Sequence, residues 1–172
     1  VRISDDNRLS KKRPCVRLDF ASIAKGYGVD QIAVLLRDNG IDNFIVEIGG
    51  DVYVSGEKKP GLPWAVGINV PQHAAAFTDV RQAITLSNQA IATSGDYRNF
   101  MEIDGQMYSH VLDPKTGYPV RTGVVSASVI ADTCALADGL ATALMVMPPT
   151  DSLKLINRLP RAACLITVKN TN

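Results

Sequence analysis

The sequence predicts an α+β fold in which a mixed, largely antiparallel sheet packs against helices. Two observations lead to this prediction. The expected elements follow the order β-α-β-β…β-α-α-β, and the strands in the middle of the chain are short and succeed one another like a meander. With 172 residues, of which 46% are hydrophobic, the chain can bury one core, so we expect a single domain over residues 1–172.

The first half of the chain is expected to centre on one helix. Val16, Leu18 and Phe20 alternate with polar residues as in a strand, and they lead into a helical pattern that ends near the C-cap pair Asn39-Gly40. The apolar positions that define the helical period include Ile23, Tyr27, Ile32, Leu35 and Leu36. Residues 1–14 are polar and are expected to be irregular after the first few residues. After the helix, strands are expected at 44–48, 52–55 and 64–70.

The second half is expected to hold most of the strands and two further helices. Asp132 or Thr133 caps a helix that runs to about Met147, is apolar on most sides and stops at Pro148-Pro149. A shorter amphipathic helix is expected over 152–159. The remaining strands are predicted at 80–86, 90–93, 100–103, 106–111, 124–131 and 162–168, after a polar connection at 71–78 in which His73 reads as solvated.

Composition excludes several classes of protein. The formal net charge is +1, so no basic field of the kind that binds nucleic acid is present, and the short run Lys11-Lys12-Arg13 reads as a solvated loop. The three cysteines are far apart and include no CxxC pair, which excludes a complete internal disulfide framework and a cysteine-rich zinc site. No apolar run reaches the ~18–20 residues that span a bilayer. Because the chain starts at Val1, a signal peptide or lipid anchor could have been removed.

The entry to the first helix carries the first candidate site. Gly26 and Gly28 stand in its first turns, where each costs about 1 kcal/mol relative to alanine, which suggests a close approach to the backbone. Asp19, Ser22 and Lys25 recur every third residue and suit a phosphate–metal ligand beside a helix N-terminus. The alternative is a helix capped by Asp19 or Ser22, with Lys25 in solvent.

Three further positions have both a structural and a functional interpretation. Asp138 and Thr142 lie four residues apart in the apolar helix and suit magnesium; alternatively, Thr142 bonds its own helix and Asp138 pairs with a basic residue. His110 precedes a Pro/Gly turn and is either a structural residue or a catalytic one. Gly49-Gly50 is first of all a hairpin turn, but it would also let a ligand touch the backbone.

Five motifs follow one another along the chain: Leu18-Asp19-x-x-Ser22-x-x-Lys25-Gly26-Tyr27-x-x-Asp30, Gly49-Gly50-Asp51, Thr93-Ser94-Gly95-x-Tyr97-Arg98, His110-Val111-Leu112-Asp113-Pro114-x-x-Gly117-x-Pro119 and Ala137-Asp138-x-x-Ala141-Thr142. Taken together and in this order, they resemble the motifs of the FAD:protein FMN transferase (ApbE) family. The match runs from about Val16 to the C-terminal strand, and the family's α+β domain agrees with the predicted element order.

The resemblance implies an enzyme that uses Mg²⁺ to split FAD at its pyrophosphate, attaches FMN through a phosphoester to a Thr or Ser of a partner flavoprotein, and releases AMP. Carried over by motif position, the metal ligands would be Asp138, Thr142 and the Ser22 carbonyl. FAD would contact Asp19, Lys25 and the backbone near Leu112. The catalytic histidine would be His110. The alternatives are an FAD pyrophosphatase that gives FMN and AMP, and a flavin-nucleotide binding module without chemistry.

The resemblance also carries expectations about context. Family members have a long segment before the first motif that supplies part of the FAD pocket, so this chain is expected to be the C-terminal portion of a longer protein. Members are typically exported, often as lipoproteins. We therefore expect a periplasmic protein held at the inner membrane by a possible lipid anchor on that upstream part. Its expected partners are acceptor flavoprotein subunits of membrane redox complexes.

Overall fold

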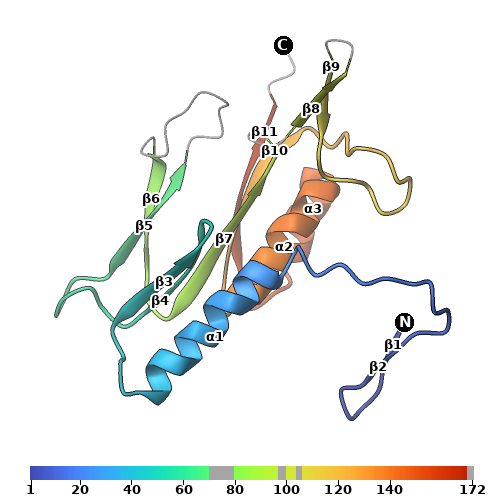
Figure 1. The fold of residues 1–172 in the computed structure, drawn as a ribbon. Helices are drawn as coiled ribbons and strands as arrows, with labels where there is room; N and C mark the ends of the chain where they lie inside the picture. The colour runs from blue at the N-terminus through green and yellow to red at the C-terminus, as the bar shows by residue number, and fades with distance from the viewer. Residues whose placement is uncertain (70–79, 97–99, 104–105, 170–172) are drawn as a thin grey trace.

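A computed structural model describes residues 1–69, 80–96, 100–103 and 106–169. Its centre is a five-stranded sheet with the order β11-β10-β7-β4-β3, in which each neighbouring pair is antiparallel (Figure 1). The α+β prediction with a largely antiparallel sheet is therefore confirmed. The elements are β1 Arg2–Ile3, β2 Leu9–Ser10, α1 Ala24–Asp38, β3 Phe44–Ile48, β4 Asp51–Ser55, β5 Trp64–Asn69, β6 Val80–Leu86, β7 Gln89–Gly95, β8 Phe100–Ile103, β9 Gln106–Ser109, β10 Val124–Ala131, α2 Cys134–Val146, α3 Pro149–Ile156 and β11 Ala163–Val168.

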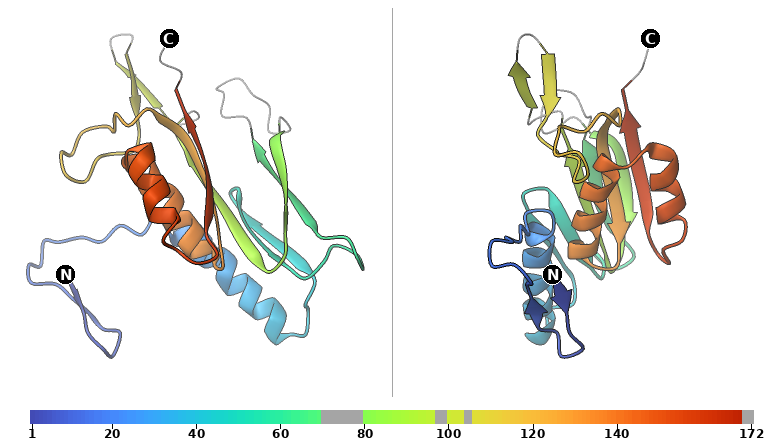
Figure 2. Two further views of the ribbon diagram at one scale, coloured as in Figure 1. Left: turned by 180° about the vertical axis from the view of Figure 1, so that it is seen from behind. Right: turned by 90° about the vertical axis from the view of Figure 1, so that its right-hand side faces the viewer.

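The sheet is covered on both faces. All three helices lie along one face, and the hairpin of β5 and β6 stands against the other, as the two views of Figure 2 show together. On the helical side one cluster joins α1 and α2 to β3 and β4, and a second joins α2 and α3 to β10. A third cluster lies between the sheet and the β5–β6 hairpin. The core therefore has two layers, with the sheet between them.

Strand β4 illustrates this double coverage. Val52 and Val54 pack toward the hairpin, whereas Tyr53 belongs to the helical cluster. Because successive side chains of a strand point to opposite faces, Asp51 and Tyr53 share the helical side. Every residue of β4 is buried, including Asp51. A carboxylate is thereby placed under the helices at the first position of a fully buried strand.

The helix ends follow the sequence signals more closely than the helix faces do. Asn39 caps α1, and Gly40 follows with φ 76°, as the Asn-Gly pair predicted. Thr133 caps α2 and accepts a hydrogen bond from Leu136 N at 3.4 Å. Helix α3 begins at Pro149 rather than at residue 152, because proline fits the first turn of a helix, where its missing N–H is not needed.

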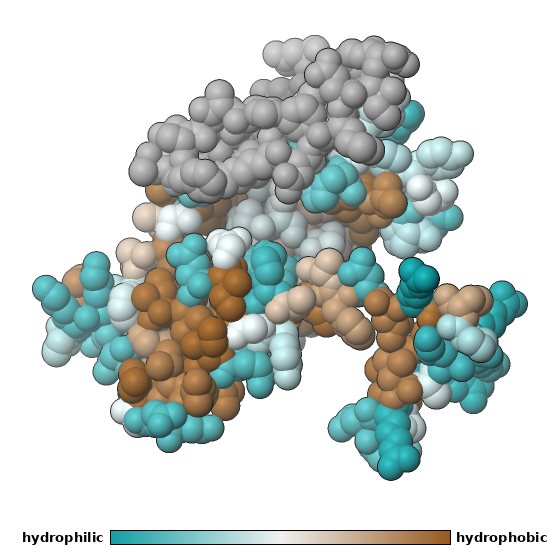
Figure 3. All heavy atoms as spheres, viewed as in Figure 1, coloured by the Kyte–Doolittle hydropathy of each residue, from teal (hydrophilic) through white to brown (hydrophobic). Residues whose placement is uncertain are grey.

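The prediction of a strand directly before α1 is wrong. Residues 16–20 form no strand, and Leu18 and Phe20 are exposed. The face of α1 that is buried consists of Gly26, Val29 and Ala33, because only small side chains let α1 approach α2 and the sheet closely. Leu36 is half-buried, but most of the larger apolar side chains of α1 remain exposed. The exposed ones are Tyr27, Ile32, Val34 and Leu35, with Ile23 just before the helix. Figure 3 shows a brown area over this helix.

In the described residues, no helix is long and apolar enough to cross a membrane. The segment 71–78 with His73 lies outside the described residues, as do Tyr97 and Arg98 of the third motif.

Candidate functional site

Lys25 lies between two buried carboxylates. Its Nζ is 2.6 Å from Oδ2 of Asp51 and 4.0 Å from Oδ1 of Asp138. The two carboxylate side chains are 1% and 5% exposed, whereas that of Lys25 is 43% exposed. The lysine side chain therefore ends at the acidic residues and is also partly open to solvent, from which an anionic ligand can approach it.

The close approach of α1 to α2 builds this arrangement. A Cβ on Gly26 would lie 2.3 Å from the carbonyl oxygen of Cys134, so only glycine fits at this position. Gly26 N then donates to Oδ2 of Asp138 at 3.1 Å. The expected close approach to the helix backbone is confirmed, and the approaching group is the N-terminus of α2.

Asp30 fixes the same contact from the other side. Its carboxylate accepts hydrogen bonds from Cys134 N at 2.7 Å and from Ala135 N at 2.9 Å. These are N–H groups at the start of α2, which have no partner inside the helix and which favour a negative charge. Asp30 is therefore a capping residue contributed by another helix, and it sets the position of α2 relative to Lys25.

The Gly49-Gly50 turn supplies the second carboxylate. It joins β3 to β4 with φ 57° and 90°, as a tight hairpin turn with two left-handed residues requires. The turn interpretation is thus confirmed. The turn also lies against Lys25, since a Cβ on Gly49 would be 3.4 Å from Cδ of that lysine. Asp51 follows directly and bonds the ammonium.

Burial dominates the electrostatics of Asp51. It raises the pKa of this carboxyl from 3.8 to about 6, although the bond to Lys25 favours the charged form. The nearby charge of Asp138 raises the pKa further. Oδ1 of Asp51 is buried and has no hydrogen-bond partner among the described residues. An unpaired buried oxygen beside a second carboxylate marks a place that a cation can stabilise.

The oxygen atoms around Asp138 fit a hard cation. In a regular helix, Gly26 N would donate to the carbonyl of Ser22, four residues earlier. Here it donates to the Asp138 carboxylate instead. As a result, no backbone N–H in the described part of the chain donates to the Ser22 carbonyl. Thr142 lies one turn after Asp138, and its hydroxyl is 3.1 Å from Oγ of Ser94 on β7. The groups expected to bind the metal, these two side chains and the Ser22 carbonyl, all offer oxygen, the donor that magnesium prefers.

Magnesium needs few protein ligands, because it usually keeps several waters and binds phosphate oxygens. Among the described residues, no group of three or more His, Cys, Asp or Glu side chains could hold a metal. The residues present therefore fit Mg²⁺ bound together with a phosphate ligand. They do not form a site that encloses a metal on all sides.

Asp19 has a different local role from the one expected of a helix cap. Its Oδ1 accepts a hydrogen bond from Ala21 N at 2.8 Å, which closes a turn before the helix. The cap position of α1 is Ile23, with no side-chain cap bond, so neither Asp19 nor Ser22 caps this helix. Asp19 is exposed, and the structure gives it no contact with Lys25.

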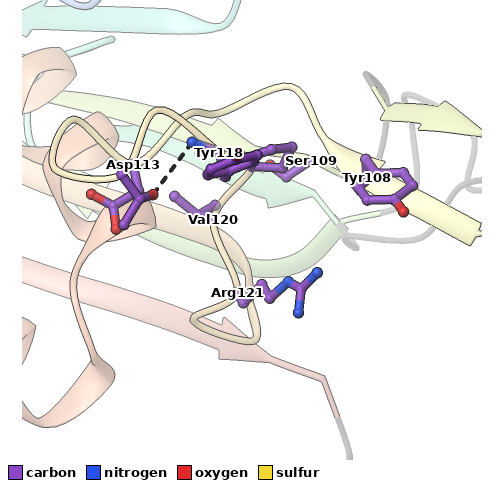
Figure 4. A pocket seen from close by; sticks show the side chains of 8 residues that line it. Tyr108, Ser109, Asp113, Tyr118, Val120 and Arg121 are labelled. Carbon is purple, nitrogen blue, oxygen red and sulfur yellow. Dashed lines mark hydrogen bonds between the residues drawn. The ribbon is translucent and has the colours of Figure 1, made fainter.

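His110 and Leu112 lie beside a pocket of about 460 Å³, a size that suits part of a dinucleotide. The pocket is formed by the end of β9 and the turn that follows it. In Figure 4, Asp113 and Tyr108 mark opposite ends of its lining. Leu112 pairs with Pro119 in an isolated antiparallel bridge that closes this turn. The lining residues are Tyr108, Ser109, Asp113, Thr116, Tyr118, Pro119, Val120 and Arg121.

The end of β7 connects the two parts of the site. Ser94 contacts Thr142, and Asp96, two residues later, interacts with His110 and with the hydroxyl of Ser109. Burial raises the pKa of Asp96, while the charge of His110 opposes this shift. One predicted ligand, Thr142, and the predicted histidine therefore each interact with a residue at this end of β7.

Sequence reasoning assigned no role to four residues that build this site: Asp30, Asp51, Ser94 and Asp96. Asp51 and Ser94 stand inside the motifs, but their function depends on partners distant in sequence, namely Lys25 and Thr142. The available signal was an acidic residue directly after a Gly-Gly turn. For Asp30 and Asp96, no local pattern indicated the partner.

Comparison with known proteins places these observations in a family. Residues 1–166 match the model of the ApbE family. The FAD:protein FMN transferase of Vibrio cholerae is 47% identical over 143 residues, which cover 83% of this chain and 42% of that protein. The enzyme of the same name from Haemophilus influenzae is 40% identical over 158 residues, covering 92% and 45%. The chain thus spans less than half the length of these curated relatives.

Solved structures agree with the fold. The flavin transferase ApbE from Vibrio cholerae matches with a TM-score of 0.81 at 41% identity, over 96% of this chain and 51% of that one. The ApbE protein from Thermotoga maritima gives the same TM-score of 0.81 at 37% identity, over 97% and 53%.

Proposed function

Because the chain belongs to the ApbE family, we propose that it carries the metal, phosphate and proton-transfer residues of a Mg²⁺-dependent FAD:protein FMN transferase. The observation that carries this proposal is the position of Lys25. Its side chain is half-exposed, and its ammonium lies 4.0 Å from Asp138, whose carboxylate has the chemistry of a magnesium ligand. An ammonium and a cation site side by side suit a pyrophosphate, which bears several negative charges.

Each part of the site has a distinct role in this proposal. Asp138, Thr142 and the Ser22 carbonyl would hold Mg²⁺, which when bound offsets the charge of the phosphates and orients them. Lys25 would bind a pyrophosphate oxygen from the adjoining side. The pocket with Tyr108 and Tyr118 offers aromatic faces to a ring of FAD, beside the backbone near Leu112.

The proposed reaction transfers FMN, through its phosphorus, from AMP to the acceptor hydroxyl. The hydroxyl oxygen of a Thr or Ser on the acceptor protein forms a bond to the phosphorus of the FMN half, and the bond from that phosphorus to the bridging oxygen breaks. His110 takes the hydroxyl proton, and Asp96 stabilises the charge that His110 gains. AMP leaves with the bridging oxygen. With water in place of the hydroxyl, the same residues would give free FMN.

A mass measurement tests this function. A candidate acceptor protein is incubated with the enzyme, FAD and Mg²⁺, and intact masses are recorded. We expect the acceptor mass to increase by one FMN, with the loss of this increase when Mg²⁺ is chelated. Free FMN and AMP without acceptor labelling would indicate a pyrophosphatase. Unchanged FAD in every sample would indicate a binding module and overturn the proposal.

We further propose that the other half of the relatives' length completes the FAD pocket around these residues. Support comes from the apolar side chains of α1 that remain exposed in this chain. By resemblance to the family, we propose periplasmic acceptors that are flavoprotein subunits of membrane redox complexes, and a lipid anchor on the enzyme. Fractionation of cells that express the full-length protein tests the location.

A further inference from the structure

Asp51 holds Lys25 from the buried side. Its Oδ2 accepts from Lys25 Nζ at 2.6 Å, and its side chain is 1% exposed. The Gly49-Gly50 turn fixes the backbone directly before it, and the pairing of Asp51 with Ile48 fixes the start of the strand. Asp51 is therefore a rigid acceptor, whereas the lysine side chain is flexible.

The same ammonium is 4.0 Å from Oδ1 of Asp138, beyond hydrogen-bond distance. Lys25 and Asp138 thus form a long ion pair without a hydrogen bond, and a shift of the flexible lysine side chain toward Asp138 would make it a direct one. Such a pair would occupy the carboxylate oxygen that a cation needs. Among the described residues, Asp51 is the only side chain that forms a hydrogen bond with Lys25 Nζ and so holds it away from Asp138.

We propose that Asp51 is a positioning residue: it keeps the Lys25 ammonium beside the Asp138 carboxylate rather than on it, and so leaves this carboxylate open to a divalent cation. This inference rests on the proposed function, in which Asp138 is a cation ligand. The proposed phosphate and metal contacts do not involve Asp51, and this inference gives that buried carboxylate a role. The lysine remains available to a phosphate on its exposed side.

Three variants distinguish an effect of the position of Lys25 from an effect of the charge of Asp51. Asp51→Ala and Asp51→Asn remove the same negative charge, but asparagine retains an oxygen that can accept from Lys25. The double variant Asp51→Ala with Lys25→Met removes one charge of each sign, so the net charge around Asp138 stays that of the wild type. It also removes the ammonium that would otherwise pair with Asp138.

The experiment measures binding of Mn²⁺, without nucleotide, to the 172-residue chain and its variants by electron paramagnetic resonance. Thermal melts first establish that each variant is folded. We expect Asp51→Ala to bind Mn²⁺ at least tenfold more weakly than Asp51→Asn. We also expect the double variant to recover at least the affinity of Asp51→Asn. Recovery on removal of Lys25 is a result that a merely structural role of Asp51 does not produce.

Equal affinities of Asp51→Ala and Asp51→Asn would overturn the inference, because the loss would then follow charge alone. A double variant as weak as Asp51→Ala would also overturn it. Either result leaves the transferase proposal intact, provided that the wild type binds Mn²⁺ and Asp138→Asn abolishes this binding. A wild type that binds no Mn²⁺ would overturn the inference together with the assignment of Asp138 as a ligand.

Discussion

The backbone N–H of Gly26 donates to Oδ2 of Asp138 at 3.1 Å, across a sequence separation of 112 residues. This bond ties the first turn of α1 to α2 at the site. It satisfies one carboxylate oxygen of Asp138 and directs the other toward Lys25. The packing of two helices and the geometry of a cation site therefore depend on the same contact.

Gly26→Ala should destabilise the protein strongly. The added Cβ would lie 2.3 Å from the Cys134 carbonyl oxygen, and backbone cannot move away as a flexible side chain can. Overpacking of this kind typically costs about 1–3 kcal/mol, and here it would also lengthen the bond to Asp138. Thermal melts followed by circular dichroism measure the loss.

Gly28→Ala is the matched control in the same helix. Its Cβ would meet only the end of the Ile48 side chain, at 3.2 Å. We expect a smaller change, partly offset by the better helix propensity of alanine. If both variants melted at the same temperature, the close approach of the two helices would not be the reason for glycine at position 26.

Asp138→Asn should abolish magnesium-dependent FMN transfer while it leaves the fold intact, because an amide oxygen can still accept from Gly26. Asp138→Ala should lose activity as well. It should also lose about 1–3 kcal/mol of stability, since a buried N–H is left without a partner. Melts with and without magnesium, compared with turnover per folded molecule, distinguish these effects. A large drop in melting temperature with unchanged turnover would contradict the ligand assignment.

His110→Ala should slow turnover by about 10²–10⁴-fold, which is the usual contribution of a general base, while FAD still binds. The loss should fall on kcat rather than on the affinity for FAD. Added imidazole should restore part of the rate, because it can take the proton in the space left by the side chain. Normal turnover in the variant would identify His110 as a structural turn residue.

The stability of the protein should depend on pH through Asp51. Its pKa is raised from 3.8 to about 6 in the folded state, so between these values the folded state binds more protons than the unfolded state. The free energy of unfolding therefore falls as pH rises from about 4 to 6, by up to about 3 kcal/mol. Asp51→Asn should lack this decrease. Urea titrations of both proteins at several pH values measure it, and parallel pH curves would contradict the assignment.

The 172-residue chain should bind FAD more weakly than a protein that contains the relatives' full length. A dinucleotide held mainly at its pyrophosphate lacks the apolar burial that encloses most of a ligand, and water screens its charged contacts. The exposed apolar side chains of α1 should also make the shorter chain associate. Calorimetry with magnesium and light scattering test both points. Equal affinities would mean that the site is complete in residues 1–172.

Local signals in the sequence determined much of the fold. The strand predicted over 124–131 is β10, Asn39-Gly40 located the end of α1, and the pair Asp132-Thr133 located the start of α2. The helix-end signals succeed because turns and caps depend on neighbours within a few residues. The same is true of the Gly49-Gly50 turn. The motif order was equally accessible, and it led to the family.

Tertiary structure alone decided which face of α1 is buried and which carboxylates surround Lys25. The helix carries apolar residues on most sides, so its periodicity could not distinguish Tyr27, which is exposed, from Val29, which is buried. The close approach of α1 to α2 decided which of these two side chains is buried. That approach depends on a contact of Gly26 with the backbone of Cys134, far along the chain. Asp51 likewise acquires its role from Lys25 and Asp138, because a buried charge is defined by its partners in space and not by its neighbours in sequence.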